Sequence, residues 1–420
     1  EKLSTTGGNS AINGGQYAAY TSKVAAGLQE KFNLVPDTAE KHIEDTINGG
    51  DKMSVPALAK LMVYASPEYF NLLLDNGLEY RDTLARPGGH YGYRTYVTKD
   101  QVGSDITNLQ LEMLKKTAAN IQLETKMVEI YRTRDEANKV VGIRVATADG
   151  YKTIEAKKGV ILATGGFGAD LERVAAYQPS LDGFVTTNST GITGDGIDMA
   201  VAIGAATVDM EQIQIHPTVQ FDTAALITEG LRGDGAILVN AEGKRFIDEV
   251  GTRDVVSAAE IAQTGSYSWL IVDEAMLQKS SVIAGYVKKG FVFSGATYEE
   301  LAAAIGVDAA AFAETMDAWN GYVAAKNDPD FGRVSFANPL DTAPYYAIKV
   351  TAGIHHTMGG VKINTETQVL NAEGVAIPGL YAAGDVTSGY EGVVHQTGNC
   401  LTICINTGRI AGFEAANLAK

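Results

Sequence analysis

The sequence predicts an α/β fold, in which a discontinuous Rossmann-like nucleotide-binding domain carries an inserted α+β domain. Gly-rich loops recur in four segments far apart in the chain, at residues 7–15, 163–168, 193–196 and 382–385. A short apolar run leads into the second loop, as a buried parallel strand does where it ends beside a nucleotide. From about residue 217 to residue 350 the composition changes, and Ala-rich segments typical of helices replace the Gly-rich loops. We therefore expect residues 1–216 and 351–420 to form the nucleotide-binding domain, and residues 217–350 to form the insertion.

Periodicity predicts the elements around these loops. Apolar residues recur at helical spacing over residues 55–75, and residues 308–325 and 399–418 also predict helices. Residues 121–155 alternate in the manner of strands, with an Ala-Asp-Gly turn that indicates a hairpin. The sequence SWLIVDE predicts a strand in the inserted part.

Composition excludes several classes of protein. The formal net charge of -16 argues against a nucleic-acid partner, because phosphate binding needs a basic face. No apolar run approaches the roughly 20 residues of a membrane-spanning helix. Cys400 and Cys404 are expected on one helix face and do not indicate a disulfide framework. We expect no metal site, and haem or iron–sulfur ligands are absent, so electrons must come from outside the chain.

The first residues, EKLSTTGGNSAINGG, look like the second half of a dinucleotide-binding βαβ unit. In such a unit a Gly-rich turn comes first, and an acidic residue about 20 residues later binds the ribose hydroxyls. Glu1 fits that acidic residue, whereas the G-x-G-x-x-G half is absent. We expect the natural protein to carry an upstream segment, and a removed N-terminal signal is compatible with the abrupt start.

Four motifs are more specific than these general features. They are QIHPT at 214–218, TEGLRGDGAILVNAEGKRF at 228–246, GTRD at 251–254 and HHTMGG at 355–360. With them, nearly the whole chain resembles the flavoprotein of the fumarate reductase and succinate dehydrogenase family, closest to its soluble flavocytochrome c type. The resemblance implies FAD, a capping domain that matches the insertion, a substrate site between the two domains, and a role in electron transport of anaerobic respiration.

The resemblance assigns FAD to the Gly-rich segments. Membrane-bound relatives attach FAD covalently through a histidine near the first of these, but residues 1–41 contain none, so we expect non-covalent FAD. The backbone N–H groups at the start of the last helix would stabilise the anionic reduced flavin. The expected FAD-binding residues are Glu1, Lys2, Gly7, Gly8, Asn9, Ser10, Gly14, Gly15, Val128, Ala163, Thr164, Gly165, Asn188, Gly194, Asp195, Gly384, Asp385, Gly398 and Asn399.

The resemblance also assigns a proton donor. Reduced flavin gives a hydride to one carbon of an activated C=C bond, and Arg253 matches the residue that protonates the other carbon. An arginine is an unusual acid, since its pKa is above about 12, but the developing carbanion is a strongly basic acceptor. Glu229 and Arg232, at i and i+3, match the relay that reprotonates Arg253 from solvent. The alternative is an ordinary surface ion-pair cluster.

Histidines supply the expected substrate contacts. His216 and Thr228 match positions that hold one substrate carboxylate, and His355 matches a position that holds the other. His356 is expected to be structural.

His395 departs from the family pattern, because the family has an arginine there, in a segment that reads GANRLGGNA where this chain has GVVHQTGNC. That arginine pairs with a substrate carboxylate, whereas a histidine is largely neutral at pH 7 and offers fewer donors. We expect the second carboxylate site to be weakened or repurposed. The substrate is then a mono-acid with a neutral or aromatic far end, or a dicarboxylate bound best by protonated His395. The alternative is that His395 caps the loop or packs under the flavin.

The expected function is reduction of the C=C bond of an α,β-unsaturated carboxylate, fumarate to succinate by default. Alternatives are a related reductase of the urocanate, acrylate or cinnamate type, a steroid dehydrogenase, or a non-catalytic FAD-binding electron carrier. Such a carrier does not require Arg253, Glu229 and Arg232. The expected partner is an external electron donor, which is a cytochrome, a flavin domain or a quinol-linked protein. A periplasmic or other extracytoplasmic location is favoured over the cytoplasm.

Overall fold

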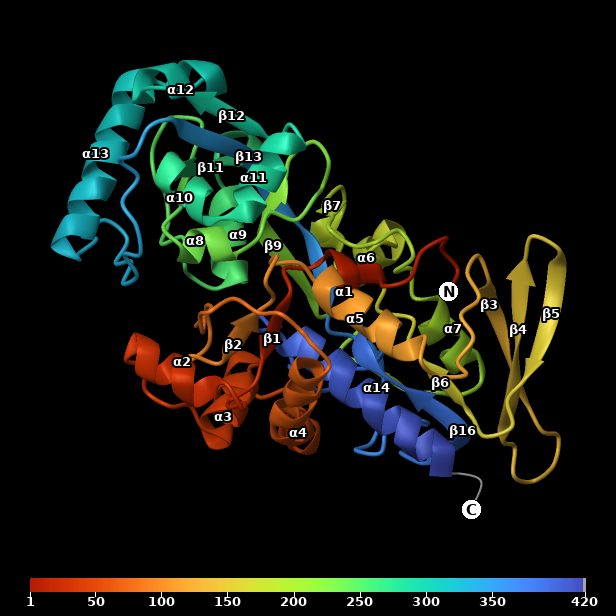
Figure 1. The fold of residues 1–420 in the computed structure, drawn as a ribbon. Helices are drawn as coiled ribbons and strands as arrows, with labels where there is room; N and C mark the ends of the chain where they lie inside the picture. The colour runs from red at the N-terminus through yellow and green to blue at the C-terminus, as the bar shows by residue number, and fades with distance from the viewer. Residues whose placement is uncertain (418–420) are drawn as a thin grey trace. The chain divides into compact units, whose positions relative to one another are not determined.

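The computed structural model describes residues 1–417, which divide into two compact units (Figure 1). Unit 1 contains residues 1–183, 188–214 and 355–417, and unit 2 contains residues 184–187 and 215–354. The short segment 184–187 in unit 2 was not part of the expected insertion. Among the described helices, none combines the length and the apolar character needed to cross a membrane.

Unit 1 mixes helices with short strands. Its helices are α1 (Gly8–Ile12), α2 (Ala25–Phe32), α3 (Ala39–Gly49), α4 (Pro56–Asp75), α5 (Ser104–Leu114), α6 (Leu171–Tyr177), α7 (Asp195–Ala202) and α14 (Asn399–Asn417), with 3-10 turns at Pro179–Leu181 and Gly384–Val386. Its strands are β1 (Gln16–Ala18), β2 (Thr95–Val97), β3 (Lys126–Arg132), β4 (Val140–Thr147), β5 (Gly150–Glu155), β6 (Val160–Leu162), β8 (Thr207–Val208), β14 (Gly360–Val361), β15 (Gln368–Leu370) and β16 (Ala376–Ala382).

The parallel pair β6 and β16 determines where the Gly-rich loops of unit 1 meet. Leu380 pairs with Val160 and Ala382 pairs with Leu162, so both strands end at the same edge and both continue into a glycine-containing loop. This is the strand-then-loop pattern expected for the run before residues 163–168. The predicted hairpin is also confirmed, since β4 and β5 pair antiparallel and close at Thr147 and Gly150.

Helix α14 contacts α4, a helix with an internal proline, Pro67. Pro67 has no N–H to offer the carbonyl of Val63, four residues earlier. The Ser66 hydroxyl donates to that carbonyl instead, at 2.7 Å. Asn406 of α14 donates to the carbonyl of Met62 at 2.8 Å, which ties the two helices together. The helices expected at 55–75 and 399–418 are therefore confirmed within the described residues.

Unit 2 is built around an antiparallel sheet with the order β10-β11-β13-β12, and β7 and β9 also pair with β13. Helices α12 and α13 pack together beside β12 (Figure 1). The core of the unit includes Trp319, Phe312 and Ile271, none of which is measurably exposed. The elements are β7 (Val185–Thr186), β9 (Ile213–Gln220), α8 (Gly230–Gly233), β10 (Ile237–Val239), α9 (Arg253–Ile261), β11 (Ser268–Asp273), α10 (Glu274–Lys279), α11 (Ser281–Lys288), β12 (Val292–Gly295), α12 (Tyr298–Ile305), α13 (Ala309–Ala325) and β13 (Tyr345–Thr357), with a 3-10 turn at Thr264–Ser266. The helix expected at 308–325 and the strand SWLIVDE are confirmed.

Candidate functional site

A cavity of about 650 Å³ opens in unit 1 where β6 and β16 end. The residues that directly follow the two strands line it, including Thr164 and Gly384. This is the place where open α/β sheets bind their ligands, outside the carboxyl ends of parallel strands. Its size lies within the range of roughly 300–1,000 Å³ typical of small-molecule and cofactor sites.

The cavity lining includes a fixed N-terminal segment, a close glycine loop and an unpaired hydroxyl. Lys2 donates to Asp195 at 2.9 Å and to Thr193 at 2.6 Å, which holds the first residues of the chain against the start of α7. Gly165 has φ +70, and a Cβ at this position would lie 2.8 Å from the side chain of Ile192. The conformation of this loop at the cavity wall therefore requires glycine. The Thr164 hydroxyl is buried without a hydrogen-bond partner among the described residues, which leaves it available to a bound group.

Most of the cofactor residues expected from the sequence line this cavity. Those that line it are Glu1, Lys2, Gly7, Gly8, Asn9, Ser10, Ala163, Thr164, Gly165, Asp195, Gly384 and Asp385. Those outside its lining are Gly14, Gly15, Val128, Asn188, Gly194, Gly398 and Asn399. Asn188 still contributes to the cavity wall indirectly, because its Oδ1 accepts a hydrogen bond from Asn9 at 2.7 Å. The Asn399 side chain is turned to His42, at 3.0 Å, and α14 begins at this residue. Sequence reasoning missed the lining residue Cys404.

Unit 2 holds a chain of three charged groups, Arg253, Glu229 and Arg232. Glu229 accepts from Arg253, with Oε2 at 2.9 Å from Nη2 and 3.2 Å from Nε. The other oxygen of Glu229 lies 3.3 Å from Nη2 of Arg232. Arg253 and Arg232 are 7% and 1% exposed, so this is not the solvated surface cluster that was the alternative for these residues. Burial lowers the pKa of Arg232 from its ordinary value.

A second buried network fixes the position of Arg232. Its Nη1 donates to the backbone carbonyl of Glu249 at 2.6 Å. The Glu249 carboxylate is itself held by Arg245 at 2.7 Å and by Arg333 at 2.9 Å. Arg333 also donates to the carbonyl of Arg232 at 2.6 Å. Removing one member of such a buried ion-pair network would leave an uncompensated charge. Glu249, Arg245 and Arg333 therefore hold Arg232 in position.

His216, on β9, has a defined tautomer. Its Nδ1 accepts the backbone N–H of Thr218 at 3.2 Å, so the ring proton of the neutral form is on Nε2. Burial lowers the pKa of His216 well below its usual value, and the positive charge of Arg253 lowers it further. His216 is therefore a neutral hydrogen-bond donor. Thr228, also buried, is positioned by its N–H, which donates to the Tyr286 hydroxyl at 3.0 Å.

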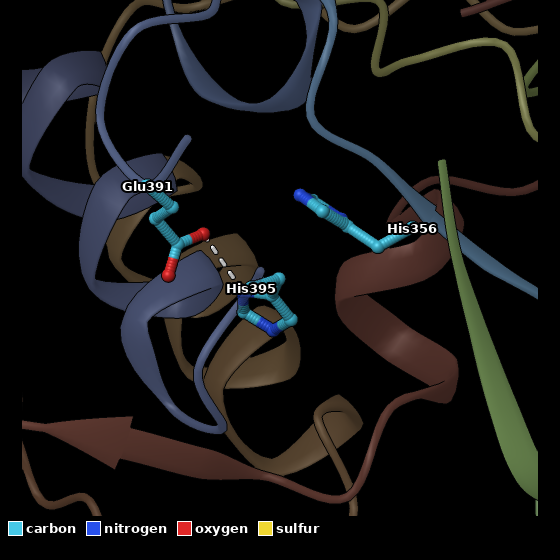
Figure 2. A group of neighbouring side chains, drawn as sticks. All are labelled: His356, Glu391 and His395. Atoms are coloured by element: carbon cyan, nitrogen blue, oxygen red, sulfur yellow. Dashed lines mark hydrogen bonds and ion pairs between the residues drawn. The ribbon is translucent and has the colours of Figure 1, made fainter. Parts of the chain in front are cut away.

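His395 lies in unit 1 in a cluster with Glu391 and His356 (Figure 2). The Nδ1 of His395 is 2.7 Å from Glu391 Oε2. The ring centroids of His395 and His356 are 4.5 Å apart, and His356 Nδ1 is 3.8 Å from Asp385 Oδ2. Burial raises the pKa of Glu391 to about 7. Sequence reasoning missed Glu391 and the contact that His356 makes with His395. The backbone carbonyl of His355 accepts a hydrogen bond from the Asn188 side chain at 3.2 Å.

The loop that carries His395 is irregular, and distant segments hold it. Gln396 donates to the carbonyls of Asp45 at 3.0 Å and Gly89 at 2.9 Å. Nε2 of His90 pairs with the carbonyl of Thr397 at 2.9 Å. The sequence feature that could have indicated Glu391 is its spacing of four from His395. Outside a helix this spacing does not predict that the two side chains meet.

Comparison with known proteins agrees with this arrangement. The sequence pattern of the FAD binding domain family matches residues 1–401. The chain belongs to this family. It is 38% identical over 423 residues to the fumarate reductase (cytochrome) of Shewanella frigidimarina, covering all of this chain and 72% of that protein. The α/β fold with a discontinuous FAD-binding domain is thereby confirmed, as is membership among FAD-dependent oxidoreductases.

Two further relatives show how much of each protein the similarity covers. The chain is 39% identical over 430 residues to the NADH:fumarate oxidoreductase of Klebsiella pneumoniae, and it spans 45% of that longer protein. The solved open conformation of a flavocytochrome c3 fumarate reductase is 37% identical, with a TM-score of 0.81 over all of this chain and 73% of that one. The similarity therefore covers the whole described chain, whereas the relatives contain additional segments.

Proposed function

We propose that this chain reduces the C=C bond of an α,β-unsaturated carboxylate, with fumarate as the reference substrate. The observation that carries the proposal is the chain from Arg253 through Glu229 to Arg232, in which both arginines are buried. A protein that only binds FAD or carries electrons needs no such chain. The named activities of the fumarate reductase and the NADH:fumarate oxidoreductase to which the chain is similar support this proposal.

Arg253 is the proposed proton donor. Its guanidinium is oriented by two hydrogen bonds to one oxygen of Glu229, at 2.9 and 3.2 Å. After Arg253 has given a proton to the substrate carbon, the Glu229 carboxylate takes a proton from Arg232 and passes it to Arg253, and Arg232 is reprotonated from solvent. No net charge then accumulates in this chain, which matters because an isolated buried charge is costly.

His216 and Thr228 are the proposed ligands of one substrate carboxylate. The neutral His216 offers Nε2–H as a donor, and the Thr228 hydroxyl offers a second. His355 and His395 are the proposed contacts at the other end of the substrate. Contacts of this kind orient a double bond, which is how an enzyme lowers the entropic cost of a reaction.

We further propose that FAD binds non-covalently in the unit 1 cavity. The lining provides Glu1 for a ribose, Lys2 for charge compensation and the unpaired Thr164 hydroxyl for a polar group. When bound there, FAD would supply the hydride for the reduction. His42 is buried with its Nε2 3.0 Å from Oδ1 of Asn399, and this engagement of the ring supports non-covalent binding.

The electron donor and the compartment are also proposals. An external donor, which is a cytochrome, a flavin domain or a quinol-linked protein, would reduce the flavin. An extracytoplasmic location is favoured. Related reductases of the urocanate, acrylate or cinnamate type remain the alternative substrate classes.

The test is an anaerobic reoxidation experiment. FAD-loaded protein is reduced with dithionite and mixed with fumarate, urocanate, acrylate or cinnamate, while flavin absorbance and the saturated product are followed. We expect rapid reoxidation with formation of one equivalent of saturated acid. Reoxidation by none of these acids, with FAD bound stoichiometrically, would reject the proposed activity.

A further inference from the structure

Glu391 is a buried carboxylate with a fixed position. It is 4% exposed, and its Oε2 lies 2.7 Å from Nδ1 of His395. Its other oxygen accepts the backbone N–H of Gln396 at 3.2 Å. Figure 2 shows the carboxylate directed at the edge of the His395 ring. The negative group is therefore held beside the imidazole and cannot turn away to solvent.

The pair lies close to the cofactor cavity within the same unit. The ring centroids of His395 and His356 are 4.5 Å apart with the planes tilted by 37°, and His356 lies 3.8 Å from Asp385, which lines the cavity. A chain of three contacts thus connects Glu391 to the cavity wall. This series of contacts contains two carboxylates, Glu391 and Asp385, and two imidazoles, His395 and His356.

The charge of this cluster does not suit a second substrate carboxylate. Within residues 1–417, the ion-pair partners of Glu391 and Asp385 are histidines, and neither carboxylate is paired with Lys or Arg. A carboxylate paired with an imidazolium has no net charge, and a carboxylate paired with a neutral imidazole has a charge of minus one. At neutral pH the Glu391–His395 pair therefore offers a substrate anion no net attraction, and an ionised Glu391 repels it.

We propose that Glu391 is a specificity-determining residue that disfavours a second carboxylate beside His395 and selects enoates with a single carboxylate and an uncharged remainder. This inference rests on the proposed function, because it assumes that His395 contacts the substrate. It names the substrate class of that site: mono-anionic α,β-unsaturated acids. Glu391 acts through His395 and through its charge, and it takes no part in hydride or proton transfer.

Fumarate and its monomethyl ester provide a matched pair of probes. They share the activated double bond and differ in one negative charge. For the wild-type holoprotein we expect kcat/KM to be higher for monomethyl fumarate than for fumarate. We expect the extra negative charge of fumarate to lower its kcat/KM about tenfold relative to the ester. A wild-type preference for fumarate would overturn the inference without any variant.

Glu391→Gln removes the charge and keeps the shape. The glutamine amide can donate to Nδ1 of His395, which leaves the ring proton on Nε2 as a donor for a carboxylate. We expect the ratio of kcat/KM for fumarate over the ester to rise about tenfold, mainly through a lower KM for fumarate. The exposed Glu373→Gln serves as the matched control and should leave the ratio unchanged.

The outcomes separate the two levels of the proposal. If reduced wild-type protein is reoxidised by none of fumarate, monomethyl fumarate, urocanate, acrylate and cinnamate, the proposed function fails and this inference fails with it. If fumarate is the better wild-type substrate, or if Glu391→Gln leaves the ratio unchanged, this inference alone is overturned. If Glu391→Gln loses FAD or does not fold, Glu391→Asp takes its place in the comparison. Glu391→Asp keeps the charge and should keep the wild-type preference for the ester. A preference for fumarate in Glu391→Asp would overturn the inference.

Discussion

Nη2 of Arg253 lies 2.9 Å from Oε2 of Glu229, and the same oxygen accepts from Nε of Arg253 at 3.2 Å. One carboxylate oxygen therefore fixes the plane of the guanidinium. Arg253 is the first residue of α9, and Glu229 directly precedes α8, so two helix starts bring the groups together. This arrangement makes the role of Arg253 testable by substitution.

Arg253→Ala should leave FAD bound and reduce kcat for enoate reduction by about a thousandfold or more, the effect of losing a positioned general acid. Arg253→Lys should retain little activity, because the ammonium cannot make the two-point contact to Glu229. Flavin absorbance gives the FAD content, and steady-state reoxidation gives kcat. Arg144→Ala, on the partly exposed hairpin of unit 1, is the control and should be active. Near-normal turnover in Arg253→Ala would remove Arg253 as the acid.

Glu229→Gln tests the relay rather than the acid. The amide keeps a hydrogen bond to Arg253 but cannot carry a proton between the two arginines. We expect kcat to fall about a hundredfold, with KM for the substrate changed less than about twofold. Glu229→Asp should recover part of kcat, because a carboxylate is restored. A parallel rise in KM with unchanged kcat would instead indicate that Glu229 only positions Arg253.

Local patterns predicted much of the fold. The strand that ends at Leu162 and the hairpin closed at Gly150 were both visible in the sequence, since each depends on neighbouring residues. The contact of Glu229 with Arg232 follows from their spacing of three. Arg253 was assigned to the same group through the motifs of the family, because 24 residues separate it from Glu229 and no periodicity links them.

The Glu391–His395 pair could not be predicted in this way. The two residues lie in an irregular loop, where a spacing of four does not place side chains on one face. Their contact depends on anchors far away in the chain, such as the hydrogen bonds from Gln396 to Asp45 and Gly89. His356 was expected to be structural, and the contact of its ring with the ring of His395 likewise depends on long-range packing.

The cofactor cavity can be tested through glycine. Gly165→Ala places a Cβ at φ +70 and 2.8 Å from Ile192, at the wall of the cavity. We expect FAD affinity to fall about tenfold, because the left-handed conformation costs a side chain about 1–2 kcal/mol and the loop must shift. Gly412→Ala, in α14, meets nothing within 4 Å and should bind FAD normally. Fluorescence titration of apoprotein with FAD measures both. Equal affinities would place FAD elsewhere.

Buried Glu260 should make stability depend on pH. It is fully buried in unit 2, with one oxygen bound by the Ser268 hydroxyl and the other without a partner among the described residues. Burial raises its pKa to about 8, well above the ordinary value of an unfolded chain. The folded state therefore holds the proton more tightly, so its contribution to stability is fully present below about pH 4.5 and is lost as pH rises to about 8.

Glu260→Gln removes this dependence and keeps an acceptor for Ser268. We expect the variant and the wild type to unfold at similar temperatures at pH 5, and the variant to be more stable at pH 9. Each unit of pKa shift corresponds to about 1.4 kcal/mol, so the gain should be measurable by calorimetry. Parallel stability curves over this range would show that Glu260 is not protonated in the fold.

Glu391 should make substrate binding depend on pH in a direction that its environment dictates. Burial raises its pKa to about 7, and the groups that face it are His395, His356 and Asp385. Below pH 7 the carboxyl is protonated and carries no charge; above pH 7 it ionises and repels a second substrate carboxylate. KM for fumarate should therefore rise up to about tenfold between pH 6 and pH 8, whereas KM for monomethyl fumarate should change little.

Steady-state kinetics of wild type and Glu391→Gln at several pH values would check this dependence. In the variant the rise in KM for fumarate should be reduced to what the histidines alone produce, because the titrating carboxyl is gone. Glu373→Gln should follow the wild-type curve, since its side chain is exposed and far from the pair in sequence. If the variant kept the full rise, the titrating group would be His395 or His356, and the ionisation of Glu391 would have no part in substrate discrimination.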